Sequence, residues 1–133
     1  MNIKNVIISV GTNDVLRSNG NVNRFYIPIQ NLLRKAKLLF ECQVYFQSVI
    51  PIPSKQSSTA KSVYEFNDLV IRACKSERCY FIDVFNEFLY CRSFDKFFDV
   101  KRGVCDIHPN RTGLSILARA FIKIVRNHFD PRL

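Results

Sequence analysis

The sequence predicts an α/β fold in which helices cover a parallel β-sheet. Strand-like and helix-like segments alternate along the 133 residues, a pattern typical of strands joined by crossover helices. Neither an internal repeat nor a linker-like stretch divides the chain, so we expect one domain over residues 1–133. Hydrophobic residues make up 47% of the chain, and 12 residues are Phe, so the chain has enough apolar side chains to form a core. We therefore expect a three-layer α/β/α sandwich.

Three segments have the composition of strands. The first, Asn5 to Val10, is apolar and typical of a strand in the middle of a sheet. The second, Gln43 to Ile50, is rich in Val, Tyr, Phe and Ile, and Pro51 ends it because proline cannot continue a strand ladder. The third is Cys79 to Asp83.

Three long helices are expected between and after these strands, over residues 24–41, after the polar loop 54–59, and over 112–128. Ser58 or Thr59 is a candidate cap of the second. A shorter helix or irregular segment is expected over 84–98. The apolar residues at helical spacing, which we expect to face inward, are Leu32, Leu33, Ala36, Leu39 and Phe40 in the first helix, Val63, Phe66, Val70 and Ala73 in the second, and Leu114, Leu117, Ala118, Phe121 and Val125 in the last.

The five cysteines are an odd number and form no C-x-x-C pair. This spacing argues against a disulfide framework and against a metal site, and we expect no metal and no cofactor. No stretch reaches the roughly 18 apolar residues of a membrane span, and the first residues do not resemble a signal peptide. We therefore expect a soluble intracellular protein, in the cytoplasm.

The formal net charge is +9. Six basic residues and one acidic residue, Asp106, lie between Lys101 and Arg126. The commoner interpretation of such a cluster is a solvated helix face. The alternative is a surface that attracts RNA or another polyanion.

The stretch Gly11-Thr-Asn-Asp14 follows the first predicted strand, where parallel sheets place their active sites. Glycine permits a tight turn there, and the amide of Asn13 is suited to donate a hydrogen bond to a developing oxyanion. The alternative is a strand-to-helix turn in which Asn13 and Asp14 act as caps.

A second stretch, Asp106-Ile-His108-Pro-Asn110, precedes Gly113 and the last predicted helix. A histidine held by a proline just before a helix, with a carboxylate nearby, is suited to act as a general base. We expect this segment, like the first, to lie at the carboxyl end of a strand of the sheet.

Taken together, in this order and on this framework, the two stretches resemble the SGNH (GDSL-type) hydrolase family of esterases and lipases. Residues 6–14, VIISVGTND, look like the third block of that family, and residues 108–113, HPNRTG, look like its fifth block. The resemblance implies a flavodoxin-like fold in which Asn13 contributes to the oxyanion hole, with Gly11 in its loop, and His108 is the general base.

The resemblance covers only the later part of the family's domain. The first block, with the nucleophilic serine, and the second block have no counterpart, and no G-D-S occurs in these residues. The chain is therefore expected to contain no nucleophile of its own. The family's acid stands three residues before the histidine, where this sequence has Cys105, whereas Asp106 stands two residues before it.

Two classes of function follow from the resemblance. The first is a carboxylic ester hydrolase acting on an acyl ester, catalytically incomplete as a 133-residue chain. The second is a non-catalytic SGNH-like module that binds RNA or docks a partner. The family's first two strands are missing, and residues 6–10 would then form an apolar edge. We expect that edge to bind a second copy of the chain, a separately encoded amino-terminal piece or upstream sequence.

Overall fold

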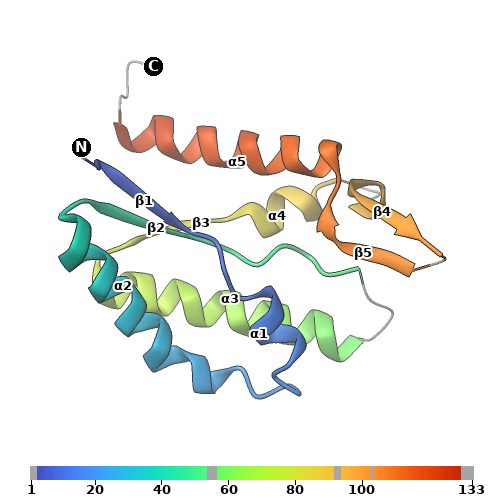
Figure 1. Cartoon of the computed structure of the whole chain (residues 1–133), viewed down its shortest axis with the longest axis horizontal. Helices are drawn as coiled ribbons and strands as arrows, with labels where there is room; N and C mark the ends of the chain where they lie inside the picture. Colours follow the sequence, from blue (N-terminus) through green and yellow to red (C-terminus); the bar gives the residue numbers. More distant parts are fainter. Residues whose placement is uncertain (1–2, 54–56, 92–93, 103, 130–133) are drawn as a thin grey trace.

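A computed structural model describes residues 3–53, 57–91, 94–102 and 104–129, with all of their side chains except those of 57, 94–95, 104–106 and 128–129. Figure 1 shows three layers: helices α2 and α3 lie on one face of a parallel sheet, and helix α5 lies on the other. This arrangement confirms the predicted α/β/α sandwich.

The sheet consists of β1 (Asn5–Ile8), β2 (Gln43–Gln47) and β3 (Tyr80–Ile82), all parallel and in that spatial order. Both β1 and β2 are shorter than predicted, because the residues after them leave the ladder and form loops at the carboxyl edge of the sheet. Within the described ranges, β1 pairs with β2 alone, so its other side is an open edge.

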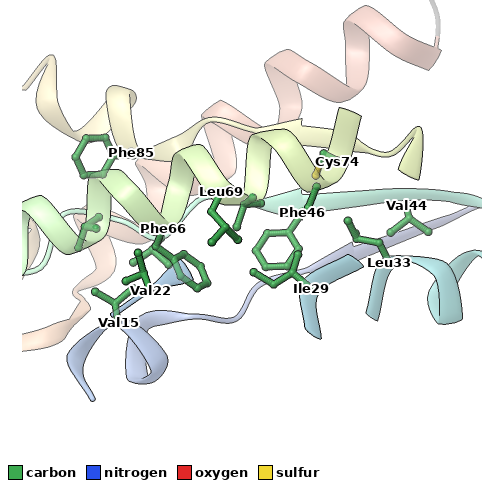
Figure 2. Close-up of a cluster of buried hydrophobic side chains, with 14 of the residues drawn as sticks. Val15, Val22, Ile29, Leu33, Val44, Phe46, Phe66, Leu69, Cys74 and Phe85 are labelled. Carbon is green, nitrogen blue, oxygen red and sulfur yellow. The ribbon is translucent and has the colours of Figure 1, made fainter. Parts of the chain in front are cut away.

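Helices α2 (Tyr26–Phe40) and α3 (Ser57–Glu77) enclose the larger core cluster against the sheet, as Figure 2 shows. Phe66 and Leu69 of α3 point toward Phe46 of β2 and Ile29 of α2. The predicted inward face of α3 is confirmed in full: Val63, Phe66, Val70 and Ala73 are all buried. The predicted cap is wrong, since α3 begins at Ser57 and Ser58 and Thr59 lie inside it.

The inward face of α2 differs from the prediction. Leu33 and Ala36 are buried as expected, but Leu39 is 76% exposed, and Leu32 and Phe40 are exposed too. On the side of α2 that faces α3, Arg34 Nη2 lies 2.8 Å from Glu77 Oε1. Lys37 Nζ donates a hydrogen bond to the Glu77 carbonyl oxygen (2.7 Å) on the same side.

Helix α5 (Arg111–Phe129) is also rotated relative to the prediction. Its buried residues are Gly113, Ile116 and Ala120, whereas Leu114 is 54% exposed and Ala118 is exposed. The remaining predicted inward residues, Leu117, Phe121 and Val125, are half-buried. The apolar arc of α5 is thus wider than the surface that the three-stranded sheet offers it.

The segment expected to be a short helix or irregular contains more structure than predicted. Helix α4 (Val84–Leu89) and the 3-10 turn η2 (Phe94–Phe97) lead into an antiparallel hairpin of β4 (Phe98–Lys101) and β5 (Val104–Pro109). The sequence pattern did not reveal this hairpin, because β4 is only four residues long and β5 shows no clear period of two. None of the helices in the described ranges is both long and apolar enough to cross a membrane.

The two leucines of α2 provide a matched test of its orientation. Leu33 is fully buried and Leu39 is 76% exposed, so Leu33→Ala should lower the free energy of unfolding by about 3 kcal/mol. Leu39→Ala should change it by no more than about 0.5 kcal/mol. Urea unfolding followed by circular dichroism measures both, and equal losses would contradict the orientation described above.

Candidate functional site

A cavity of about 440 Å³ lies at the carboxyl ends of β1 and β2. Both stretches singled out in the sequence open into it, although about 95 residues separate Asn13 from His108 along the chain. The lining residues are Ser9, Val10, Gly11, Thr12, Asn13, Asp14, Gln47, Ser48, Val49, Ile50, Ile107, His108, Pro109 and Leu117.

Gly11 makes the turn that begins one wall of the cavity. Its φ of 122° belongs to a region that favours glycine. A Cβ at this position would lie 2.7 Å from Phe66 Cζ and 3.0 Å from Val49 Cγ2. Gly11 is therefore required both for the backbone conformation and for the close approach of the core beneath it.

The short helix α1 (Thr12–Leu16) follows Gly11 directly. Asn13 is exposed on its first turn and lines the cavity. The alternative in which Asn13 and Asp14 are caps is wrong, because both lie inside α1 and no side chain caps its start. The side-chain amide of Asn13 is thus not used to stabilise the end of a helix.

His108 also lines the cavity, and its position in the fold differs from the prediction. It belongs to β5, a strand of the antiparallel hairpin, and not to a loop at the end of a parallel strand. Its side chain is exposed and lines the cavity between Ile107 and Pro109. The hairpin brings the histidine to the cavity from outside the central sheet.

Asn110 fixes the segment that follows His108. Its Oδ1 accepts a hydrogen bond from the backbone N–H of Gly113 (3.1 Å), which caps the start of α5. Its Nδ2 donates a hydrogen bond to the carbonyl oxygen of Lys96 (2.9 Å), and its backbone N–H donates one to the carbonyl oxygen of Phe97 (2.7 Å). A Cβ on Gly113 would lie 2.7 Å from the same Phe97 carbonyl oxygen. The N-R-T-G part of this stretch is therefore a helix start packed closely against η2.

Two further polar residues support the cavity, and sequence reasoning did not assign a role to either. Asn67 of α3 is buried and holds the backbone of Val49 on both sides: its Oδ1 accepts from the Val49 N–H (2.8 Å) and its Nδ2 donates to the Val49 carbonyl oxygen (3.0 Å). Ser48 is also buried, and its Oγ accepts from the N–H groups of Val84 (3.0 Å) and Phe85 (2.9 Å). No periodic pattern marks such residues, because their partners are backbone atoms of distant segments.

Two serines line the cavity, and both accept hydrogen bonds from other groups. The Oγ of Ser48 accepts two backbone hydrogen bonds at the start of α4. The Oγ of Ser9 accepts a hydrogen bond from Gln47 Nε2 (3.1 Å). The side chain of Asp106, the candidate acid, lies outside the described residues, so its role stays a prediction.

The described part of the chain contains no group of three or more His, Cys, Asp or Glu side chains that could hold a metal ion. The six basic residues of the 101–126 segment are all exposed. The Nζ of one of them, Lys123 of α5, lies 3.5 Å from Glu87 Oε1 of α4. Binding of RNA or another polyanion to these residues stays a prediction.

The fold is shared with known hydrolases. An acetylxylan esterase from Geobacillus stearothermophilus superimposes with a TM-score of 0.71 at 21% identity, over 92% of this chain and 59% of its own. An α/β hydrolase enzyme from the metagenome of Lake Arreo, Spain, gives a TM-score of 0.72 at 18% identity, with the same coverage. No family model and no curated protein matches the sequence.

This chain thus spans less than two thirds of the length of these solved structures. Solved structures of the same acetylxylan esterase include catalytic mutants in which a serine, an aspartate or a histidine is replaced by alanine. At these levels of identity the likeness establishes the fold that this chain shares with them.

Two glycines test the turn at the cavity wall. Gly11→Ala combines an unfavourable φ with contacts to Phe66 and Val49, and should lower the free energy of unfolding by about 4 kcal/mol. Gly20→Ala is the matched control, because Gly20 also has a positive φ (82°) but open space around it. Its cost should be about 1–2 kcal/mol. Similar losses in urea unfolding would contradict the close packing beneath Gly11.

Proposed function

We propose that this chain is part of a serine-dependent carboxylic ester hydrolase, in which His108 is the general base and Asn13 is an oxyanion donor. The observation that carries the proposal is the shared cavity: two polar side chains suited to these two roles, from segments far apart in the sequence, both line it. The nucleophilic serine belongs to a segment outside these 133 residues.

The proposed reaction follows from these positions. The serine hydroxyl oxygen attacks the acyl carbon of the ester while its proton passes to the imidazole of His108. The former carbonyl oxygen becomes an oxyanion that accepts a hydrogen bond from the Asn13 side-chain amide. When the intermediate collapses, the alcohol leaves with the proton from His108. Water then repeats the sequence on the acyl-serine, which releases the carboxylic acid and restores both groups.

The related acetylxylan esterase supports this assignment of roles. Its catalytic mutants replace a serine, an aspartate and a histidine, and the last two are three positions apart along that chain. In this sequence Cys105 occupies the equivalent spacing from His108, and Asp106 is one residue nearer. We therefore assign the base to His108 and leave Asp106 as the candidate acid.

The 133-residue chain alone should not hydrolyse p-nitrophenyl acetate above the background rate. The reason is that the proposal places the nucleophilic serine outside this chain, so neither cavity serine, Ser9 or Ser48, is assigned to attack the ester. Turnover by the purified chain that disappears in Ser9→Ala or Ser48→Ala would contradict this expectation and identify a nucleophile within the chain.

A completed site should be active. We expect turnover when the amino-terminal segment of the Geobacillus esterase, which carries the serine replaced in its catalytic mutant, is linked in front of this chain. His108→Ala should abolish that turnover, and Asn13→Ala should lower kcat by about 10²–10³-fold. Asn31→Ala, an exposed asparagine on α2, is the matched control and should have no effect. Turnover that survives His108→Ala would refute the proposed role of the histidine.

A further inference from the structure

We propose that Cys74 and Cys79, at the turn that joins α3 to β3, form a reversible disulfide bond when a small-molecule disulfide such as oxidised glutathione oxidises them. Both are free thiols in the structure. The turn precedes β3 and therefore lies at the amino edge of the parallel sheet, whereas the cavity lies at its carboxyl edge. The bond is thus independent of the proposed ester hydrolysis.

The backbone of the turn brings the two cysteines together. The N–H of Cys79 donates a hydrogen bond to the carbonyl oxygen of Cys74 (2.9 Å), and the N–H of Arg78 donates one to the carbonyl oxygen of Lys75 (3.4 Å). Arg78 has a φ of 55°, the left-handed conformation that commonly follows the end of a helix. These features define a Schellman motif, in which the side chains at the positions of Cys74 and Cys79 frequently contact each other.

The hydrogen bond of 2.9 Å also limits the distance between the Cα atoms of the two cysteines. Standard bond lengths keep these atoms within about 6.8 Å of each other, and closer when the intervening atoms are not collinear. Cysteines joined by a disulfide bond have Cα atoms about 4.4–6.8 Å apart. The backbone separation is therefore one that a disulfide bond spans.

Both side chains face the same hydrophobic core cluster. Cys74 is 2% exposed and extends from α3 into the cluster (Figure 2), and the half-buried Cys79 packs against it. The thiol of Cys74 donates a hydrogen bond to the carbonyl oxygen of Tyr80 (3.8 Å). The thiol of Cys79 donates one to the carbonyl oxygen of Glu77 (3.7 Å). Thiols are weak donors, so little is lost when a side-chain rotation joins the two sulfur atoms.

Helix α2 holds the turn between the cysteines in place. Glu77 lies within this turn, and its Oε1 is 2.8 Å from Arg34 Nη2. Its carbonyl oxygen accepts a hydrogen bond from Lys37 Nζ (2.7 Å). Because the backbone of the turn is already ordered, closing the disulfide bond costs little further conformational entropy.

The environment of the thiols favours exchange with a disulfide over oxidation by peroxide. Burial, with a smaller contribution from the nearby Cys79, raises the pKa of Cys74 to about 12. Burial also raises the pKa of Cys79, although Lys37 opposes the shift. Few thiolates are therefore present, which disfavours sulfenic acid formation. A pKa of about 12 leaves a thiolate fraction of about 10⁻⁴ at pH 8, and an effective molarity of about 10⁵ M between well-oriented groups compensates for it.

The half-buried Cys79 is the thiol that reacts first, because Cys74 is inaccessible. The Cys79 thiolate attacks one sulfur of oxidised glutathione, forms a mixed disulfide and releases one glutathione thiolate. The Cys74 thiolate then attacks the Cys79 sulfur, which forms the protein disulfide bond and releases the second glutathione thiolate. The two released thiolates take up the two protons of the cysteines. The protein thus loses two electrons, and these reduce one oxidised glutathione to two molecules of glutathione.

The test is incubation of the folded chain with oxidised glutathione at about pH 8 until the number of free thiols is constant. The remaining thiols are then alkylated and the chain is digested with trypsin. Trypsin cleaves after Lys75 and Arg78, so a bond between the two cysteines appears as two joined peptides that dithiothreitol separates. Cys79→Ser should abolish the joined peptides. Cys91→Ser is the matched control, because Cys91 is a half-buried free thiol elsewhere in the chain, and it should leave them unchanged.

Thermal unfolding measures how well the bond fits the fold. A bond between residues that the fold already places together should raise the melting temperature of the oxidised chain by about 5 °C or more over that of the reduced chain. Dithiothreitol should reverse this shift in the same protein, so the comparison requires no substitution. Circular dichroism of Cys79→Ser checks that this variant folds.

Three outcomes would overturn the proposed bond. The first is the absence of the joined peptides, with or without glutathione attached to Cys79. The second is an oxidised chain that melts at a lower temperature than the reduced chain, since the bond would then distort the turn. The third is a yield of the bond that is as high in urea as in the folded chain at the same ratio of oxidised to reduced glutathione. Proximity in the sequence, and not the fold, would then account for it.

Discussion

Two consecutive residues of α3, Phe66 and Asn67, hold both the turn at Gly11 and the loop after β2. The ring of Phe66 lies where a side chain on Gly11 would be. Asn67 binds the backbone N–H and C=O of Val49, whose side chain closes the other side of Gly11. Because both residues are buried and adjacent on one helix, a change in the position of α3 would move both parts of the cavity wall together.

The two candidate site residues, Asn13 and His108, lie on parts of the chain that are held in place by different contacts. Asn13 follows a strand of the central sheet and rests on the main core through Val15, whereas His108 is on a hairpin that pairs with no strand of that sheet within the described residues. Asn110 connects the two systems, because it caps α5 and also binds the backbone of η2. The position of the histidine relative to the sheet therefore depends on the packing of α5.

The two helices whose inward faces were mispredicted share one property. In both α2 and α5 the arc of apolar side chains is wider than the part of the helix that packs against the three-stranded sheet. Hydrophobic periodicity locates the centre of the whole apolar arc, which differs from the centre of the packed part. The face of α3 was predicted correctly, since Val63, Phe66, Val70 and Ala73 are all buried.

Local composition and periodicity predicted the α/β class, the three parallel strands and the long helices, and motifs singled out the two stretches that line the cavity. The hairpin that carries His108, the rotation of α2 and α5, and the structural roles of Ser48, Asn67 and Asn110 became apparent only in the folded chain. Each of these depends on contacts between residues far apart in the chain. An ion pair such as Arg34–Glu77 or a side-chain bond such as Asn67–Val49 leaves no periodic trace in the sequence.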